Sequence, residues 1–435
     1  MQKKKLGDDS IKKRMITLFL SVTTCLFFVG CSKRIASIQT NNVSTTEVSV
    51  TDRESYLDNI LSEEIILLDK DEFRITANGF DASGEKGPEI DLLIENYTDS
   101  SILISGSYDR INGYSAPDSF HPVTLLPKEK TTGKITLDRS QLDYLDILGN
   151  IHFQSVLNIT DSGTNEIVFD SCPISLFLNL IPETDDSSEY ILEKATIQEE
   201  TLADTDLVKI TAIDLNTDGS FGPELNIRIE NKTSEPFSFD IDSGSINDYM
   251  VDMYCDAPLI MPGTTDTKIL ISSNTFKQCS ITNIYRMDFS IRLTQSSPDS
   301  SFSCSYPASL KTNLPEAPDE NLRTSGNVLY DTEELLIANT GIYKETPAGW
   351  GLLMYIENRT DKTITIQTKD VVINEKNSDA AINITLPPYK KTAADLTFLN
   401  SEIDTSDSDL VTAKFRLFIR YPGFLETTSD YQIVF

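Results

Sequence analysis

The sequence predicts an all-β protein that contains three tandem copies of one β-sandwich domain. Three observations support this fold class: one motif occurs three times in 435 residues, apolar and polar residues alternate beside each copy, and no long helical periodicity follows the N-terminal region. A chain of this length is also expected to form about three domains of roughly 100–200 residues each. We therefore expect one domain for each copy of the motif.

The N-terminal 30 residues have the organisation of a signal peptide. Residues 1–14 are rich in lysine and arginine, and residues 15–30 contain no charge. Such a run is shorter than the roughly 20 residues of a membrane-spanning helix. Its end, the sequence Phe-Val-Gly-Cys at 28–31, resembles the lipobox of bacterial lipoproteins, in which the Cys thiol accepts diacylglycerol. The resemblance implies cleavage before Cys31 and lipidation of its thiol, with an uncleaved anchor or ordinary secretion as alternatives.

Three segments of low apolar content are expected to connect the folded parts. Residues 31–55 are rich in Ser and Thr and predict a flexible tether that spans roughly 25–30 Å. Segments 181–189 and 313–326 combine proline with acidic residues and predict semi-stiff linkers. The expected domains are residues 56–180, 190–312 and 327–435. Together they predict an extended, three-domain stalk on a lipid anchor.

The repeated motif is Glu-Asn-x-Thr at the end of an alternating apolar stretch. Its asparagine is Asn96 in the first copy, Asn231 in the second, 135 residues later, and Asn358 in the third, a further 127 residues later. The same two offsets align the Ile-Asn pairs that end at Asn112, Asn247 and Asn374, and the glycines Gly87, Gly222 and Gly349. Because several features agree on one register, chance is a poor explanation.

Each copy of the motif is expected to close the first strand of a β-hairpin. In the second copy Leu225, Ile227 and Ile229 alternate with polar residues, the pattern of a strand with one buried face. Polar residues follow the motif, and a second alternating stretch begins at Phe237. Proline-containing turns, further strands and a short helical turn, clearest at 140–145 in the first unit, complete each unit. About seven short strands per unit are typical of an immunoglobulin-like sandwich.

As a whole, residues 15–435 resemble surface lipoproteins of Gram-positive, clostridia-type bacteria. In these proteins a lipobox and a short tether precede tandem immunoglobulin-like domains that carry an Ile-Glu-Asn-x-Thr strand end. Only the lipobox and the repeat are specific to this resemblance, and it implies no catalytic activity. It implies an extracytoplasmic protein, anchored to the cell membrane by lipid.

The charge of the chain limits the classes of partner. Without the first 31 residues the net charge is −34, because that segment holds six basic and two acidic residues. Such a surface repels phosphate backbones and anionic headgroups, which argues against nucleic acid binding. We expect a non-enzymatic surface protein without a cofactor, whose domains act as spacers or bind an envelope protein. The alternative is a carbohydrate-binding or adhesion protein that contacts an envelope glycan.

One local motif resembles a calcium loop. Asp214, Asn216 and Asp218 precede a glycine in the order Asp-x-Asn-x-Asp-Gly. An EF-hand requires a glutamate at the twelfth position of the loop, where Leu225 stands, and it requires flanking helices. The motif is therefore interpreted mainly as a hairpin turn, with a calcium site as the alternative.

Four cysteines follow Cys31, and none matches a zinc or Cys-x-x-Cys pattern. Export permits disulfides, and Cys255 with Cys279 would close a loop within the second domain. Cys172 and Cys304 lie in corresponding last strands, where burial as small apolar residues is expected. The possible disulfide is therefore Cys255–Cys279, with three cysteines in that domain leaving one unpaired.

The remaining candidates are histidines and aromatic residues. His121 precedes a proline, His152 lies on the outward phase of a strand, and no nucleophile motif surrounds either, so we expect no catalytic role. The single tryptophan is Trp350. With exposed tyrosines such as those at 108, 114 and 249 it is a candidate for stacking on sugar rings, against packing in a core or at an edge.

Overall fold

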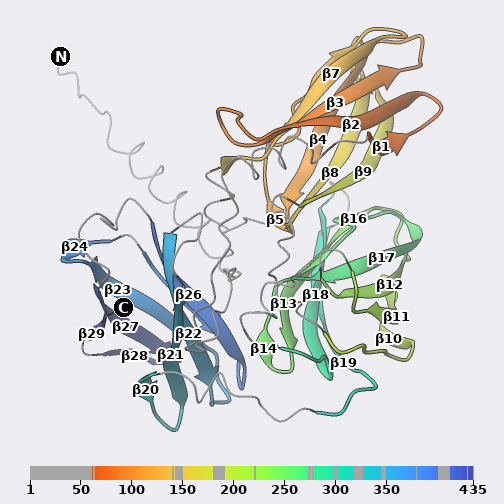
Figure 1. Cartoon of the computed structure of the whole chain (residues 1–435). Coiled ribbons are helices and arrows are strands. Elements are labelled where there is room, and N and C mark those ends of the chain that lie inside the picture. Colours follow the sequence, from red (N-terminus) through yellow and green to blue (C-terminus); the bar gives the residue numbers. More distant parts are fainter. Residues whose placement is uncertain are drawn as a thin grey trace, which may run out of the picture.

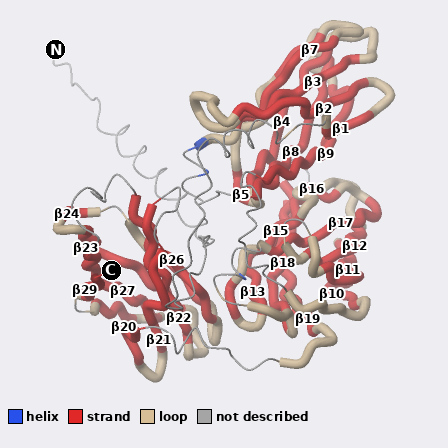
Figure 2. The backbone as a smooth tube through the Cα atoms, viewed as in Figure 1, coloured by secondary structure: helices blue, strands red, loops and turns tan. Residues whose placement is uncertain are grey.

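The computed structural model describes eleven segments and four single residues of the chain. They are residues 64–139, 150–179, 192–219, 222–272, 281–296, 301–316, 327–343, 349–378, 380–399, 412–428 and 430–434, with Leu61, Leu142, Phe276 and Cys279. The expected signal peptide, Cys31 and the tether lie outside the described residues. Within them the structure is all-β, as the sequence predicts (Figures 1 and 2). No helix in these segments is long and apolar enough to cross a bilayer.

The first repeat, residues 64–179, contains two sheets that face each other across one apolar core (Figure 1). One sheet has the order β1-β2-β3-β7, from β1 (Ile65–Asp69), β2 (Phe73–Asp81), β3 (Glu89–Asn96) and β7 (Lys130–Thr136). The other has the order β5-β4-β8-β9 with β6 on β4, from β4 (Ile102–Ile111), β5 (Tyr114–Ser115), β6 (Val123–Leu125), β8 (Asn150–Asp161) and β9 (Ile167–Asn179).

The second repeat, residues 192–316, follows the same strand order, with β15 (Met253–Cys255) as an additional strand. Its first sheet has the order β10-β11-β12-β17-β15, from β10 (Glu200–Asp204), β11 (Val208–Asn216), β12 (Glu224–Asn231), β17 (Gly263–Ile271) and β15 (Met253–Cys255). Its second sheet contains β13 (Phe237–Ile246), β14 (Tyr249–Met250), β16 (Leu259–Ile260), β18 (Arg286–Ser296) and β19 (Ser301–Lys311). Asn313 lies at the start of the expected linker and forms two hydrogen bonds with Thr196. Asn313 N donates to Thr196 O at 2.9 Å, and the Asn313 side-chain oxygen accepts from Thr196 N at 2.7 Å.

The third repeat, residues 327–434, begins with β20 (Asn327–Asp331), β21 (Leu335–Tyr343), β22 (Gly349–Asn358) and β26 (Lys391–Leu399), which form one sheet. The facing sheet contains β23 (Ile364–Ile373), β24 (Lys376–Asn377), β25 (Asn383–Leu386), β27 (Thr412–Tyr421), β28 (Phe424–Thr427) and β29 (Tyr431–Val434). A parallel bridge from β14 to β26 joins this repeat to the second in one nine-stranded sheet. The second repeat lies at a corner between the other two, so the three do not form a straight stalk (Figure 1).

The predicted alternation of apolar residues is confirmed in all three repeats. The inward residues of the strand before the motif are at most 1% exposed: Ile90, Leu92, Ile94, Leu225, Ile227, Ile229, Leu352, Met354 and Ile356. The preceding strand has a register shift at the same place in each repeat, between Ala77 and Gly79, Ala212 and Asp214, and Asn339 and Gly341. The sequence repeat is therefore a repeat of backbone geometry as well.

The Glu-Asn-x-Thr motif holds the turn that follows it. The buried Asn96 amide donates to the carbonyl oxygens of Ser100 and Leu126 at 2.8 and 2.9 Å, and its oxygen accepts from Thr98 N at 2.9 Å. The same bonds form around Asn231 and Asn358. Because a buried amide without partners costs about 1–3 kcal/mol, this residue is suited to closing a buried corner. The motif has a structural explanation in every repeat.

Candidate functional site: the junctions between the repeats

The Ile-Asn pair forms a second shared turn, at the opposite end of each repeat from the first. Asn112 N donates to His152 O at 2.9 Å, and its side-chain oxygen accepts from His152 N at 2.7 Å. Asn247 makes the same two bonds with Arg286, and Asn374 with Thr412. In each turn the asparagine and the next residue have positive φ. Each repeat therefore presents the same structure at this end.

In the first repeat this end contacts the second repeat. We call these contacts the first junction. The Gln154 amide donates to the carbonyl oxygens of Cys255, at 3.1 Å, and of Asp256. Arg110 forms an ion pair with Asp240 at 2.7 Å. Side chains of one repeat thus bond to the backbone and a carboxylate of the next.

His152 lies inside the first junction and is 0% exposed. Its ring stacks on Phe177 at 3.9 Å between centroids, and the Tyr254 ring lies 5.8 Å away. Its Nε2 atom is 3.2 Å from an Asp256 carboxylate oxygen. His152 does face away from its own core, as the sequence predicts, but the second repeat covers it. The alternation of residues along a strand indicates which way His152 faces, but it does not indicate that another repeat lies against this side chain.

Two further features bring the repeats into close contact. Gly113 has φ +81°, and a Cβ atom there would lie 2.5 Å from the Tyr254 side chain, so only glycine allows this approach. The Tyr114 hydroxyl bonds to the Asp252 carboxyl group across the junction. Burial raises the pKa of Asp252 to about 6, although the Tyr114 bond lowers it. Burial, with Asp256 and Asp252 nearby, also raises the pKa of Tyr254 well above its ordinary value.

In the second repeat the corresponding end contacts the third repeat and forms the second junction. Tyr249 pairs with Lys391 in a parallel bridge, and Lys391 N donates to Asp248 O at 3.0 Å. Lys390 Nζ lies 2.8 Å from carboxylate oxygens of both Asp248 and Asp288, and Arg286 pairs with the same two carboxylates. Four alternating charges therefore hold the start of β26.

An apolar face of the third repeat completes the second junction. Leu336, Leu353, Tyr355 and Ala393 point away from the third core, are at most 4% exposed, and belong to the core of the second repeat. The positions that align with them in the second repeat are polar: Lys209, Asn226, Arg228 and Asp266. Arg228 and Asp266 form an exposed ion pair at 2.7 Å where the third repeat has Tyr355 and Ala393. The unbroken apolar run at 352–356 was the sequence signal of a strand buried on both faces.

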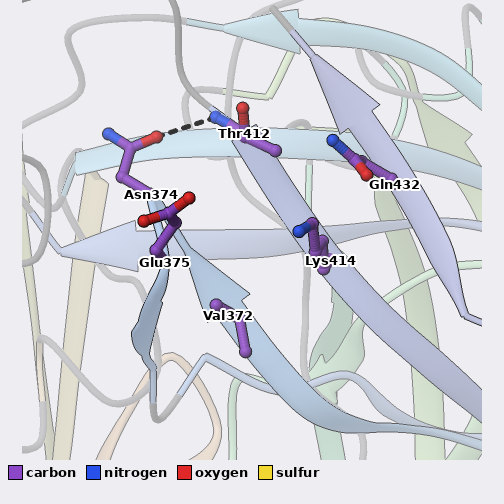
Figure 3. Close-up of a pocket in the computed structure, with 6 residues that line it drawn as sticks. All are labelled: Val372, Asn374, Glu375, Thr412, Lys414 and Gln432. Carbon is purple, nitrogen blue, oxygen red and sulfur yellow. Dashed lines mark hydrogen bonds between the residues drawn. The ribbon is translucent and has the colours of Figure 1, made fainter.

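The same end of the third repeat forms an open depression of about 300 Å³. Its lining, drawn in Figure 3, is Val372, Asn374, Glu375, Thr412, Lys414 and Gln432. Strand register aligns Thr412 with His152 and Arg286, and Lys414 with Gln154 and Asp288. Positions that form junctions in two repeats therefore line a depression in the third, and no other described repeat covers it.

The candidate calcium ligands have protein partners. Asp214 and Asn216 lie in β11, and Asp218 lies in the following turn. The Asn226 amide donates to Asp214 at 2.6 Å, and Asp218 N donates to the Asn216 side chain at 3.1 Å. In the part of the chain that the structure describes, no three His, Cys, Asp or Glu side chains gather as a metal site requires. The hairpin-turn interpretation accounts for these bonds.

The possible Cys255–Cys279 disulfide does not form in the structure. Cys255, Cys279 and Cys172 are buried free thiols, and the free Cys304 thiol is half-buried. Cys255 Sγ accepts from Ala257 N at 3.4 Å beside the first junction, whereas Cys279 bonds to the Ala393 amide in the second junction. The two thiols face different surroundings. Burial raises the pKa of each to about 12.

The tyrosines expected to be exposed are only partly so. Tyr108 is 54% exposed, but Tyr114 and Tyr249 lie in the junctions, and Tyr249 packs under the Lys391 ammonium group, which is 4.3 Å from its ring centroid. The side chain of Trp350 lies outside the described residues. His121 is exposed, and its Nε2 lies 2.9 Å from Thr136 Oγ1. The described side chains among these residues form neither a shared aromatic face nor a nucleophile–base pair.

Comparisons with known proteins add little to this geometry. The sequence matches no family of known proteins, and no curated protein matches it. Among solved structures, the YadV chaperone covers 53% of this chain with all of its own length, at 11% identity and a TM-score of 0.17. A Porphyromonas gingivalis W83 protein of unknown function covers 53% with 94% of its own chain, at 17% identity and a TM-score of 0.15.

A DUF4785 family protein from Legionella pneumophila subsp. pneumophila str. Philadelphia 1 is also similar. It covers 86% of this chain and 92% of its own, at 10% identity and a TM-score of 0.16. Scores this low carry no argument about fold or function.

Proposed function

We propose that this chain is a non-enzymatic surface lipoprotein in which three immunoglobulin-like domains act as spacer and interaction modules. The single observation that carries the proposal is the repeated use of one end of the repeat. That end binds the second repeat in the first junction, binds the third in the second junction, and lies open at Glu375 and Lys414. The second junction holds this open end in a fixed orientation relative to the second repeat, where it contacts a protein of the envelope.

The arrangement of each domain supports the immunoglobulin-like assignment. Two sheets enclose one core, strands follow one another in the same order in each repeat, and the shared asparagines hold the same two turns. Residues common to the three repeats serve turns and packing, which favours a binding or spacing role over catalysis. Two of the tyrosines considered for sugar stacking are used in junctions, so carbohydrate binding has less support.

The interaction role is tested with the full chain purified from its native envelope. Cross-linked partners of the unaltered chain are compared with those of a Lys414→Glu variant, which reverses the charge in the depression. We expect the Lys414→Glu variant to lose the partner that the unaltered chain recovers. A matched Lys194→Glu variant reverses the charge of an exposed lysine in the second repeat and should retain the partner. Equal recovery with Lys414→Glu would remove the depression from the proposal.

The lipid anchor has its own test. A Cys31→Ser variant should lose incorporation of a labelled fatty acid and move from the membrane fraction to the soluble fraction, since two acyl chains hold a protein stably on a bilayer. A Cys304→Ser variant, which changes a half-buried free thiol, should stay with the membrane. Membrane retention of Cys31→Ser would contradict lipidation at this residue.

A further inference from the structure

The first junction gathers titratable groups from both repeats. The first repeat contributes Tyr114, His152 and Arg110, and the second contributes Asp252, Tyr254, Asp256 and Asp240. Among the described residues, no lysine or arginine forms an ion pair with Asp252. Its partner across the junction is the Tyr114 hydroxyl. Ionisation of Asp252 therefore places a charge in the contact without a neutralising cation.

Burial raises the pKa of Asp252 from its ordinary value of 3.8 to about 6. A carboxyl group that is more basic in the docked state than in the separated state favours docking when it is protonated. This contribution is complete below pH 3.8 and is lost as the pH rises through about 6. Across pH 5 to 8 these two values correspond to a roughly tenfold fall in the docking equilibrium constant.

We propose that the first junction is a pH-sensitive hinge, in which the first repeat docks on the second most tightly in acid and is released as Asp252 ionises. The hinge changes the orientation of the first repeat relative to the other two, and it depends neither on the lipid anchor nor on a partner. It gives an envelope protein a response to the acidity of its surroundings.

The other titratable groups of the junction lie beside one another. The His152 Nε2 atom lies 3.2 Å from an Asp256 carboxylate oxygen. Arg110 forms its ion pair with Asp240, at 2.7 Å. Tyr254 stays neutral from pH 5 to 8 because its pKa lies well above this range.

Hydroxyl-radical footprinting of the full chain tests the hinge. Tyr254 is 6% exposed in the docked state, Tyr108 is 54% exposed and serves as the reference, and Tyr355, 1% exposed, reports on the second junction. From pH 5 to 8 we expect modification of Tyr254, relative to Tyr108, to increase about tenfold. Modification of Tyr355 should stay constant.

Two variants distinguish Asp252 from the rest of the junction. Asp252→Asn keeps the shape and a hydrogen-bond acceptor but cannot ionise, so Tyr254 should stay protected from pH 5 to 8. Tyr114→Phe removes a bond that lowers the pKa of Asp252, so the midpoint of the Tyr254 response should move to higher pH. A flat response in the unaltered chain, or an unchanged response in Asp252→Asn, would overturn the proposal. If Asp252→Asn does not fold, an unmoved midpoint in Tyr114→Phe overturns it.

Discussion

The two junctions use the same end of a repeat but hold the neighbouring repeat differently. In the first, polar side chains such as Gln154 reach backbone carbonyls, and the His152 ring lies 5.8 Å from the Tyr254 ring of the second repeat. In the second, a strand of the third repeat joins the sheet of the second, and Tyr355 enters its core. The difference shows that a shared fold fixes where repeats meet, while the outward residues decide how firmly they are held.

The two junctions also shift the pKa of a carboxyl group in opposite directions. Asp252 in the first junction has a raised pKa, whereas the pKa of Asp288 in the second is lowered. Burial of Asp288 acts to raise its pKa, but bonds from Lys390 and Ser309 and the charges of Lys390 and Arg286 outweigh it. Acid therefore favours the first junction and weakens the second.

The largest expected effect comes from breaking the second junction. The second repeat has an ion pair between Arg228 and Asp266 at the positions that align with Tyr355 and Ala393. A chain with both Tyr355→Arg and Ala393→Asp would carry the same pair in the third repeat. The third repeat should keep its own fold, but the loss of a buried aromatic contact should cost about 3–5 kcal/mol of coupling. Calorimetry should then resolve separate unfolding transitions for the second and third repeats.

The control for this variant removes the exposed pair itself. Arg228→Ala with Asp266→Ala should change stability by less than about 1 kcal/mol, because surface ion pairs contribute little. A single, unshifted transition in the Tyr355→Arg, Ala393→Asp chain would show that the apolar face does not couple the repeats.

The next effect separates close approach from backbone strain in the first junction. Gly113→Ala combines an unfavourable positive φ with a methyl group 2.5 Å from Tyr254, whereas Gly423→Ala has φ +99° with nothing within 4 Å. Both variants include strain at positive φ, but only Gly113→Ala should include a clash of about 1–3 kcal/mol. Footprinting should show Tyr254 exposed in Gly113→Ala alone. Exposure in both, or in neither, would contradict the close contact.

A smaller effect follows from acidifying the second junction. Because the pKa of Asp288 is lowered, its contribution is present above its ordinary value of 3.8 and is lost as the pH falls through the lowered value. We expect modification of Tyr355 to increase between pH 5 and 3, because Asp288 loses its charge-assisted bond to Lys390 when it is protonated. Lys390→Met should reduce this pH dependence. A Tyr355 signal that is insensitive to acid would refute the charge cluster as a source of docking.

The smallest effect is expected at the open end of the third repeat. Lys414→Glu should change stability by less than about 0.5 kcal/mol, because no described repeat covers this position. Gln154→Glu, at the aligned position of the first repeat, removes the donor to Cys255 O and should expose Tyr254 to radicals. Equal destabilisation by the two variants, measured by urea unfolding, would mean that the third end is also covered.

The internal structure of each repeat was predictable because it depends on local patterns. Alternation places Ile227 inward, and the motif asparagine identifies the turn, since both follow from strand geometry and hydrogen bonding within a few residues. The sequence also indicates that His152 faces away from its core. It does not indicate what lies opposite, because docking depends on residues about a hundred positions away.

The hypotheses for the cysteines and for the tyrosines both left out the contacts between repeats. Cys255 and Cys279 share a domain, but one borders the first junction and the other the second, so their proximity in sequence did not imply contact. Tyr114 and Tyr249 were expected to be exposed because their own repeats leave them so, yet each is used by the next repeat. The apolar run that ends at Ile356 was the available signal of this docking.

The apolar face of the third repeat also affects how the chain folds as it is synthesised. Among the described residues, the core of the first repeat ends at Leu178, so this core is complete once that part of the chain has emerged. The core of the second repeat includes Tyr355 and Ala393, which emerge long after its last strand. The second and third repeats therefore complete their folding as one cooperative unit, and the nascent second repeat keeps an apolar surface exposed until its neighbour arrives.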